Sequence, residues 1–360
     1  MAHVGVIFGG RSVEHQVSIV SARTVARGLR EAGHQVTPLG IAQDGCWIGH
    51  EASEAIIEGS ARSIAPLGLP VAPTLRHLIA SGVDVLFPIV HGTWGEDGTL
   101  QGLCEMLDLP YVGPGVTASA LAMDKVLCKR QLAAAGVPVV EFEATTRRQF
   151  EADPESFLRR ARKLPAPLFV KPSVGGSSVG IQKVDDPAGL EEAVRFALRF
   201  DEAVLVERGM RGRELETAVL GYGEVQASAV GEIVPSQDFY DYADKYLLDS
   251  AGLIAPADLP DRVADRLRQI AIDAFVAVGG VGLARVDFFL EGEDDLYVNE
   301  LNTLPGFTAI SMYPRLWEIS GVPLPELTDR LVQIALARHR DRHRLDEGIK
   351  TFLKELAERV

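Results

Sequence analysis

Four polar side chains stand at alternate positions in two apolar stretches near the C-terminal end of the chain. Arg285 and Asp287 lie in one stretch, and Glu300 and Asn302 lie in the other. Side chains two residues apart share one face of a β-strand, so each pair is expected to point to one side. If the two strands form a hairpin around the acidic run 291–295, two carboxylates, an amide and a guanidinium converge.

Such a group of oxygen donors favours one kind of metal site. Magnesium prefers oxygen ligands and is commonly held by one or two carboxylates together with substrate phosphates. The pattern therefore indicates a nucleotide-bound Mg²⁺ rather than zinc. The alternative is a solvated hairpin of alternating charge. It is disfavoured because Asp287, Glu300 and Asn302 interrupt sequence that would otherwise form a core.

A glycine- and serine-rich loop at 172–180 follows an expected strand that ends at Lys171. Glycines let backbone N–H groups approach an anion closely, and Lys125 offers a second ammonium group for phosphates. Glu207 and Glu214 flank a bend and could bind an adenine amine and ribose hydroxyls. Taken singly, each charge is more often a surface group, and the loop is more often a plain hairpin. The chain has neither a GxxxxGK[ST] loop nor a GxGxxG after a strand, so Walker and Rossmann sites have no support.

The first part of the chain, residues 1–123, is predicted to be a parallel α/β domain. A strand over 3–8 leads through a glycine turn into a helix. That helix is expected to bury the stripe Val13, Val17, Val20, Val25 and Leu29. The run 83–90 is apolar on both faces, which is typical of a buried parallel strand. Glu14 and His91 then lie beyond the carboxyl ends of strands, the edge at which open α/β sheets bind ligands.

Two further domains are predicted, over 124–214 and 215–360. The second contains a helix from Asp124 through Leu132, the strand 168–171, the glycine- and serine-rich loop and the strand 203–207. The third contains strands between 215 and 234, a polar aromatic loop over 238–246, a helix from 261 to about 278, the metal hairpin and a helical tail. The length of 360 residues agrees with two or three domains.

Composition excludes several functional classes. The net charge of −14 argues against a nucleic-acid partner. The basic cluster 338–344 is expected to be a solvated helix face. No apolar run reaches the ~18 residues of a spanning helix, and the N-terminus does not have the features of a signal peptide. A soluble, cytoplasmic protein with no membrane partner is expected. The cysteines, Cys46, Cys104 and Cys128, are expected to be reduced.

Six motifs in a fixed order, spread over about residues 3–335, resemble the D-alanine–D-alanine ligase family. They are GGRSVEH at 9–15, HGTWGEDGTLQG at 91–102, YVG at 111–113, KPSVGGSSVG at 171–180, FYDY at 239–242 with Lys245 and Tyr246, and NELNTLPG at 299–306. The resemblance implies an ATP-grasp fold of the α/β class. An N-terminal parallel α/β domain would be followed by central and C-terminal α+β domains with the nucleotide between them.

The resemblance also implies a reaction and its cofactors. Two D-alanines would be joined through a D-alanyl phosphate for peptidoglycan precursor synthesis, with ATP converted to ADP and phosphate. Two Mg²⁺ ions are implied, with Mn²⁺ able to substitute, and a homodimer is expected. Cofactor ligands are implied at Lys125, Lys171, Glu207 and Glu214 for ATP, and at Asp287, Glu300 and Asn302 for metal.

Roles for substrate-binding and catalytic residues follow from the same resemblance. Substrate would be bound by Glu14, His91, Arg285, Ser311 and Met312, with Glu14 holding the ammonium of the first D-alanine. Ser311 and Met312 would meet the carboxylate of the second. Family members often carry Leu at the position of Met312, so this chain departs from the family there, but the pocket stays apolar. Arg285 and the N–H of Gly306 would stabilise an oxyanion, and Lys245 would reach the transferred phosphate. Ser177 and Tyr246 would form a hydrogen-bonded link with Glu14 that closes loops over the site.

Two alternatives are kept. A D-alanine–D-lactate ligase is disfavoured because such ligases lack a tyrosine at the position of Tyr246. A non-catalytic ATP-binding module on the same fold would show erosion of the metal ligands or of Arg285, and the sequence shows none.

Overall fold

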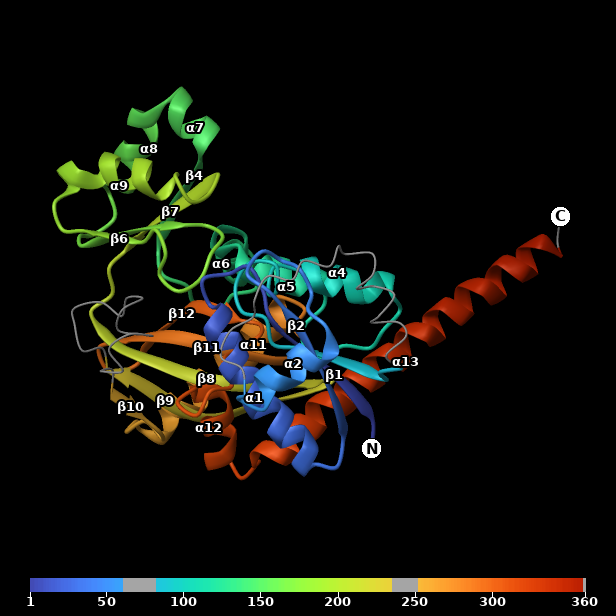
Figure 1. Cartoon of the computed structure of the whole chain (residues 1–360). Helices are drawn as coiled ribbons and strands as arrows, with labels where there is room; N and C mark the ends of the chain where they lie inside the picture. Colours follow the sequence, from blue (N-terminus) through green and yellow to red (C-terminus); the bar gives the residue numbers. More distant parts are fainter. Residues whose placement is uncertain (61–81, 235–251, 359–360) are drawn as a thin grey trace.

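The N-terminal residues form a three-stranded parallel sheet (Figure 1). The computed structural model describes residues 1–60, 82–234 and 252–358. The central strand β1 (His3–Gly9) pairs with β2 (Gln35–Ile41) on one side and β3 (Val85–Pro88) on the other. The helices of this part are α1 (His15–Glu31), α2 (His50–Ile57), α4 (Thr99–Met106) and α5 (Val116–Met123). Every residue of β3 is buried, which confirms the prediction of a buried parallel strand.

The expected apolar stripe of α1 is partly wrong. Val25 and Leu29 are buried, but Val13 precedes the helix and is exposed, as is Val20. The buried face instead carries Ser18 and other small residues, which lie directly against the sheet. The Ser18 hydroxyl accepts from the Gly9 N–H at 2.7 Å and donates to the Ile89 carbonyl at 2.6 Å. Short polar side chains can be buried in this way because their hydrogen bonds are satisfied by strand ends.

The central part of the chain forms a separate four-stranded antiparallel sheet in the order β4-β7-β5-β6. Its strands are β4 (Phe142–Thr146), β5 (Leu168–Pro172), β6 (Gln182–Val184) and β7 (Ala203–Arg208). Its helices are α7 (Arg147–Ala152), α8 (Pro154–Ala161), the 3-10 turn η1 (Pro187–Gly189) and α9 (Leu190–Ala197). Helix α6 (Lys125–Ala134) precedes this sheet in the chain, and its buried Cys128 and Leu132 belong to a core shared with the C-terminal part. The predicted strands 168–171 and 203–207 and the helix from 124 are confirmed.

The C-terminal part forms a five-stranded antiparallel sheet in the order β10-β9-β8-β11-β12. The strands are β8 (Gly212–Tyr222), β9 (Glu224–Val234), β10 (Gly252–Ile254), β11 (Gly282–Glu291) and β12 (Asp295–Asn302). The helices are α11 (Asp261–Ala277), α12 (Met312–Ile319) and α13 (Leu324–Ala357). Strand β8 starts at Gly212, so a domain boundary between 214 and 215 falls inside a strand.

The hydrophobic cores show how the three sheets are related. One core contains side chains from β1, β3 and α1 together with Phe307, Tyr313 and Leu331 from the C-terminal part. The central sheet has a core of its own, built around Phe150 and Phe157. In Figure 1 the central part, with α7, α8 and α9, stands apart from the other two. The N-terminal and C-terminal parts therefore share one hydrophobic core, whereas the central sheet contributes no residue to that core.

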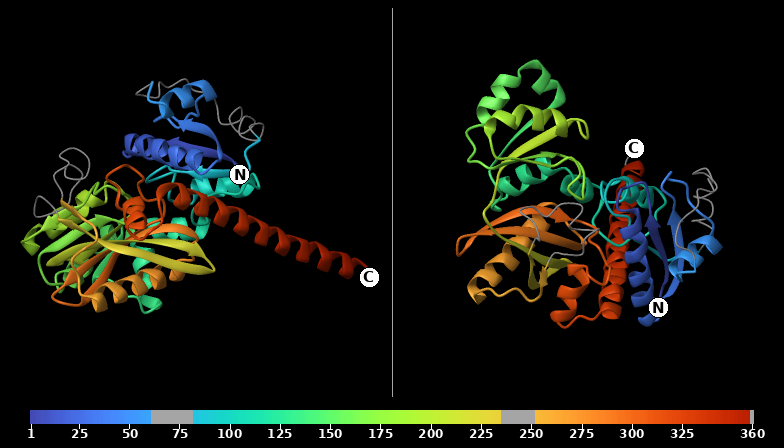
Figure 2. Two further views of the ribbon diagram at one scale, coloured as in Figure 1. Left: turned by 90° about the horizontal axis from the view of Figure 1, so that it is seen from below. Right: turned by 60° about the vertical axis from the view of Figure 1, so that its left-hand side comes forward.

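Helix α13 lies between the N-terminal sheet and the C-terminal sheet, and its far end projects from the body of the protein (Figure 2). It packs closely on α1 at Gly28, where a Cβ atom would lie 2.9 Å from Leu324 Cγ. Only glycine permits this approach without displacing the leucine.

The basic cluster 338–344 is not simply a solvated face, contrary to expectation. The Arg338 side chain is only 12% exposed. Its guanidinium donates to the Gly113 carbonyl at 2.9 Å and to the Tyr111 hydroxyl at 2.6 Å. It also donates to Glu105 Oε1 at 3.1 Å, and Arg342 contacts the same carboxylate. The arginines face α4 and the segment that follows it, because the acceptors are grouped there. Helical spacing alone does not reveal such partners.

We expect Arg338→Met to lower the free energy of unfolding by about 1–3 kcal/mol, because it leaves part-buried acceptors without a donor. Arg340→Met is the matched control, since Arg340 is exposed on the same helix. Chemical unfolding of both variants measures the difference. Equal stability of the two variants would contradict this role for Arg338.

The three cysteines are free thiols, as predicted. Burial raises the pKa of Cys104 to about 12 and that of Cys128 to about 11, so both stay protonated at neutral pH. Among the described residues, no helix combines the length and apolar character needed to cross a membrane.

Candidate active site

The hairpin β11–β12 brings the predicted polar residues together. Arg285 pairs with Asn302 and Asp287 pairs with Glu300 across the two strands. The Arg285 guanidinium donates to both oxygens of Asp287, at 2.7 Å each. The Asn302 amide donates to Asp287 Oδ2 at 3.0 Å. The polar faces of β11 and β12 therefore lie on the same side of the sheet, which is the arrangement that the sequence pattern needs to form one site.

A β-bulge shapes the second strand of this hairpin. The register shifts after Asp287, which pairs with Glu300, so that Phe288 pairs with Val298 and Asn299 is the extra residue. Without the bulge, Tyr297 and Glu300 would point to opposite faces of the sheet. With it, Tyr297 lies beside Phe289 while Glu300 lies beside Asp287. An apolar section and an acidic section then follow one another along the same face.

Glu216 on β8 is a further acidic member of this group that sequence reasoning missed. It pairs with Asp287 across β8 and β11, and its Oε2 lies 3.2 Å from Arg285 Nε. Burial alone would lower the pKa of Arg285, but the charges of Asp287 and Glu216 raise it well above its usual value. The spacing of Glu214 and Glu216 could have indicated it, because residues two apart on a strand lie on the same face of the sheet.

A cleft of about 950 Å³ separates the central sheet from the C-terminal sheet. Its apolar lining comes from both sides, and includes Phe169, Val179, Ile181, Met210 and Phe289. Its polar lining contains all four predicted nucleotide ligands, Lys125, Lys171, Glu207 and Glu214, together with Glu300. The cleft is thus apolar where a flat ring could stack and charged toward the acidic hairpin.

The two predicted lysines lie in different surroundings within this cleft. Lys125 Nζ donates to the Gly175 carbonyl at 2.6 Å and lies 3.9 Å from Glu300 Oε2. Lys171 Nζ lies 2.5 Å from Glu207 Oε2 and donates to Asn299 Oδ1 at 3.5 Å. Both ammonium groups therefore lie between the glycine- and serine-rich loop and the acidic hairpin.

Lys129 was not predicted, although it is placed one helical turn after Lys125. Its ammonium is 2.7 Å from Glu207 Oε1, and both side chains are nearly inaccessible to solvent. Burial alone would raise the pKa of Glu207, but Lys129 and Lys171 outweigh it and lower that pKa to about 2. Glu207 is therefore an anion held between two ammonium groups. The i, i+4 spacing of the two lysines on α6 was the only sequence signal.

We expect Glu207→Gln to lower the free energy of unfolding at pH 7 by about 3–5 kcal/mol, because it leaves two buried ammonium groups without their counter-ion. A carboxyl whose pKa is depressed in the folded state stabilises the fold above its unfolded pKa. That contribution is lost as pH falls from about 4.5, the usual value, toward 2. Wild type and variant should therefore converge in stability over this range.

Urea unfolding at several pH values measures this convergence, with Glu202→Gln as the control because Glu202 is exposed. A difference between wild type and Glu207→Gln that stays constant from pH 7 to pH 3 would contradict the assigned ion pairs.

The glycine- and serine-rich loop comes close to Glu14, which stands at the N-terminus of α1. A Cβ atom on Gly176 would lie 3.1 Å from Glu14 Oε2, and one on Gly92 would lie 2.9 Å from it. Ser177, next in the loop, is buried and has a left-handed backbone with φ of +53°. The Glu14 carboxylate therefore sits where the N-terminal and central parts of the chain meet.

His91 has both ring nitrogens bonded inside the protein. Nδ1 lies 2.8 Å from the Leu304 carbonyl oxygen, which only accepts, so Nδ1 carries the hydrogen. Nε2 lies 3.1 Å from the Ser21 hydroxyl and accepts from it, while that hydroxyl accepts from the Phe307 N–H at 3.0 Å. Burial lowers the pKa of His91, and Glu14 only partly opposes this. A neutral imidazole thus holds the turn that contains Gly306.

Glu96 is a second residue that holds this turn, and sequence reasoning did not single it out. Its carboxyl group accepts from the Leu304 N–H at 2.8 Å and from the Gly92 N–H at 2.7 Å. Burial, with a further contribution from Glu14, raises the pKa of Glu96 to about 8. The motif containing His91 therefore positions the loop after β12 as well as its own loop.

Gly306, Ser311 and Met312 lie at the entrance to α12. A Cβ atom on Gly306 would lie 2.7 Å from Ser311 Oγ, so the two residues are in direct contact. Met312 is buried, and its Cε would lie 2.1 Å from a Cβ on Gly231. Because the Met312 side chain is part of the core, a ligand at this position would contact the backbone N–H of Met312. The predicted residues Lys245 and Tyr246, with the loop 238–246, lie outside the described residues.

Comparison with known proteins gives concordant matches. A family model described as D-ala D-ala ligase N-terminus matches residues 3–114, and one described as D-ala D-ala ligase C-terminus matches residues 131–333. A D-alanine–D-alanine ligase of Solibacter usitatus is 46% identical over 340 residues, covering 94% of this chain and 97% of that protein. One of Chloroherpeton thalassium is 43% identical over 361 residues, with the same coverage of both proteins.

Two solved structures are similar over nearly the whole chain. The D-alanine-D-alanine ligase from Coxiella burnetii has a TM-score of 0.83 and 36% identity, covering 98% of this chain and 99% of that one. The VanG D-Ala:D-Ser ligase from Enterococcus faecalis has a TM-score of 0.79 and 32% identity, covering 93% and 99%.

Proposed function

The chain belongs to the D-alanine–D-alanine ligase family, and from this premise we propose how its residues join two D-alanines at the expense of ATP. It is an ATP-dependent ligase with an ATP-grasp fold that forms D-alanyl-D-alanine for peptidoglycan synthesis. The observation that carries the mechanism is the convergence of Arg285, Asp287, Glu300 and Asn302 beside a cleft with two ammonium groups.

ATP lies in the cleft, with adenine among its apolar residues and the phosphates directed toward the hairpin. Lys125 and Lys171 neutralise phosphate oxygens, and Glu207 and Glu214 provide acceptors for the nucleoside. The oxygen donors of Asp287, Glu300 and Asn302 fit two Mg²⁺ ions, and Mn²⁺ ions have the same preference. When bound, these ions would withdraw charge from the phosphoryl group and help align it.

The substrates lie on the other side of the hairpin, toward the N-terminal sheet. Glu14 binds the ammonium group of the first D-alanine, because its carboxylate faces the junction of the N-terminal and central parts. Ser311 and the backbone N–H of Met312 bind the carboxylate of the second D-alanine at the start of α12, where N–H groups lack partners within the helix. His91 acts at a distance from the substrates, since its ring holds the turn that contains Gly306.

The reaction has two steps. A carboxylate oxygen of the first D-alanine attacks the γ-phosphorus of ATP, and the bond to ADP breaks. The amine of the second D-alanine then attacks the carbonyl carbon of the D-alanyl phosphate, loses a proton, and phosphate leaves with the carboxylate oxygen. Arg285 and the Gly306 N–H stabilise the tetrahedral oxyanion, and one such donor is typically worth about 10²–10³ in rate.

Closure of the central part over the cleft protects the D-alanyl phosphate from water. The part that closes is the sheet β4-β7-β5-β6 with α7, α8 and α9, because α6 packs in the core of the C-terminal part. We place its boundary with the third domain at Gly212, where β8 begins. The separate core of the central sheet permits such movement as a unit. Ser177 and Tyr246 link with Glu14 on closure, and Lys245 reaches the transferred phosphate. We further propose that the protein is a homodimer in the cytoplasm.

Oxygen-18 tracing tests this mechanism. D-alanine labelled in its carboxylate is incubated with ATP and the enzyme, and the released phosphate is analysed by mass spectrometry. The D-alanyl phosphate route predicts transfer of one labelled oxygen from D-alanine to phosphate in each turnover. Unlabelled phosphate, formed together with dipeptide, would contradict it.

A further inference from the structure

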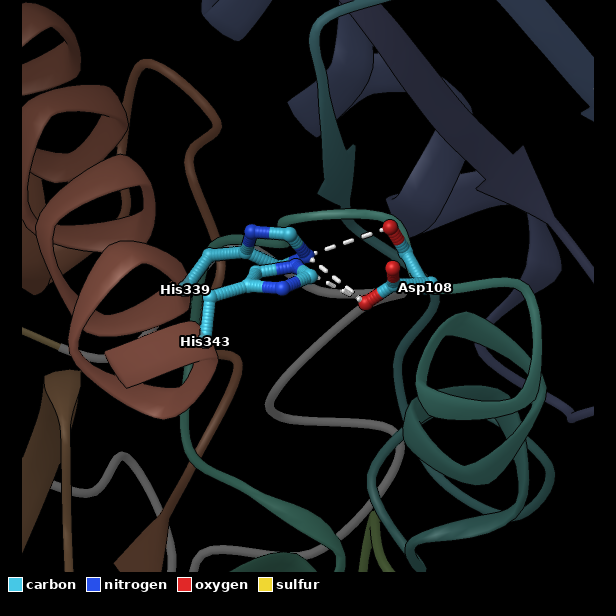
Figure 3. Close-up of side chains that lie close together, drawn as sticks. All are labelled: Asp108, His339 and His343. Carbon is cyan, nitrogen blue, oxygen red and sulfur yellow. Dashed lines mark hydrogen bonds and ion pairs between the residues drawn. The ribbon is translucent and has the colours of Figure 1, made fainter. Parts of the chain in front are cut away.

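Two histidines of α13 and one aspartate of the N-terminal part meet away from the ATP cleft. His339 and His343 are one helical turn apart, and Asp108 lies in the turn after α4 (Figure 3). Asp108 Oδ1 lies 3.2 Å from Nε2 of each histidine. The ligand atoms of all three residues lie within 4.8 Å of one another.

The fold holds these residues in place from both sides. On α13, Arg338 is bonded to Gly113, Tyr111 and Glu105, which fixes the rotation of the helix just before His339. On the other side, Asp108 has a left-handed backbone with φ of +52°, which turns its side chain toward α13. The two ring centroids lie 4.5 Å apart, and Nε2 of each ring points to the same carboxylate.

The chemistry of the donors selects a class of ion. Imidazole nitrogens suit Zn²⁺, Cu²⁺ and Ni²⁺, whereas Mg²⁺ prefers oxygen ligands alone. Two histidines at i and i+4 on one helix face are a recurrent zinc-binding pair. Bonds of about 2.0–2.2 Å in tetrahedral geometry separate neighbouring donors by about 3.3 Å. The observed 3.2 Å between each Nε2 and Oδ1 therefore matches the edge of a tetrahedral site.

Solvent access and local charge also permit a cation. The three residues line a recess that is open to solvent, so water can supply a fourth ligand. The His343 side chain is 46% exposed and that of Asp108 is 72% exposed, so ions can enter. Arg338 and Arg342 are the nearby positive charges, and both pair with the carboxylate of Glu105.

We propose that Asp108, His339 and His343 form a binding site for a divalent cation of the Zn²⁺ class, which fastens α13 to the turn after α4. The site takes one ion for each chain and uses no residue of the ATP cleft. Its role is structural, because it joins the C-terminal helix to the turn after α4 in the N-terminal part (Figure 3). An ion bound only in the folded state stabilises that state by mass action.

The test is titration of the full-length protein with Co²⁺ and with Zn²⁺ in the presence of saturating Mg²⁺, which occupies the oxygen-ligand site. Calorimetry gives stoichiometry and affinity, and the visible spectrum of Co²⁺ reports tetrahedral coordination. We expect one site whose affinity falls as pH is lowered, because protons compete with the metal ion for its ligands. His339→Gln, His343→Gln and Asp108→Asn should each weaken it by at least about 10-fold, a loss that even outer ligand-shell changes can cause.

His50→Gln is the matched control, since His50 is exposed and lies elsewhere. Asn is chosen at position 108 because it tolerates a left-handed backbone. Circular dichroism and unchanged ligase activity show that each variant is folded. Absence of a tetrahedral Co²⁺ spectrum, or an affinity that the three substitutions leave unchanged, would overturn the proposal. The contacts would then be only hydrogen bonds of the two imidazoles with the Asp108 carboxylate and, for His339, with the Asp108 carbonyl.

Discussion

Asp287→Asn and Glu300→Gln should each abolish ligation while leaving the fold largely intact. Several kcal/mol of transition-state stabilisation depend on ions held by these oxygens, which corresponds to a loss of about 10³-fold or more in rate. Stability should change little, because the Glu216 carboxylate remains 3.2 Å from the Arg285 guanidinium in both variants and still balances its charge. The amides keep the size and shape of the side chains that they replace.

Phosphate release and circular dichroism on the purified variants decide this prediction. Glu293→Gln is the matched control, because Glu293 is an exposed acidic residue in the turn of the same hairpin. Turnover like that of wild type in both Asp287→Asn and Glu300→Gln would end the metal assignment. Loss of turnover together with loss of the folded spectrum would instead assign these residues to stability.

Glu14→Gln should weaken binding of the first D-alanine by about 2–5 kcal/mol, the typical cost of removing one partner of a buried charge pair. Binding of ATP should change far less. Glu14 stands at the N-terminus of α1 in the N-terminal part, whereas the apolar residues proposed to receive adenine belong to the central and C-terminal parts.

Equilibrium binding of ATP and the D-alanine dependence of turnover separate the two effects. Glu31→Gln is the control, since Glu31 is exposed at the other end of α1. Equal losses for ATP and D-alanine would contradict this division between the two ligands.

The main elements of the fold could be predicted because their signals are local. A run apolar on both faces predicted β3, and alternating strands around an acidic turn predicted β11 and β12. The apolar stripe of α1 was less reliable. Its buried face includes Ser18 and Ser21, whose hydrogen bonds with strand ends and with Phe307 are long-range. Burial that depends on partners far along the chain leaves no periodic signal.

The described candidate site was predicted where its residues share a strand or a motif. The sequence indicated Asp287, Glu300 and Asn302 through their spacing, but the bulge at Asn299 depends on pairing and has no counterpart in that spacing. Lys129 and Glu96 were missed because their partners, Glu207 and Leu304, are remote in sequence. In the sequence, neither residue can be told from an ordinary surface charge, because only the fold brings its partner within hydrogen-bonding distance.

The choice of nucleophile tests the central claim most directly. Phosphate release and product mass are measured with ATP and D-alanine alone, and then with L-alanine, D-lactate and D-serine each offered beside D-alanine. The account predicts that D-alanine alone supports release of phosphate and yields D-alanyl-D-alanine, which remains the main product in every mixture. No phosphate release with D-alanine, or a main product that contains D-lactate or D-serine, would contradict it.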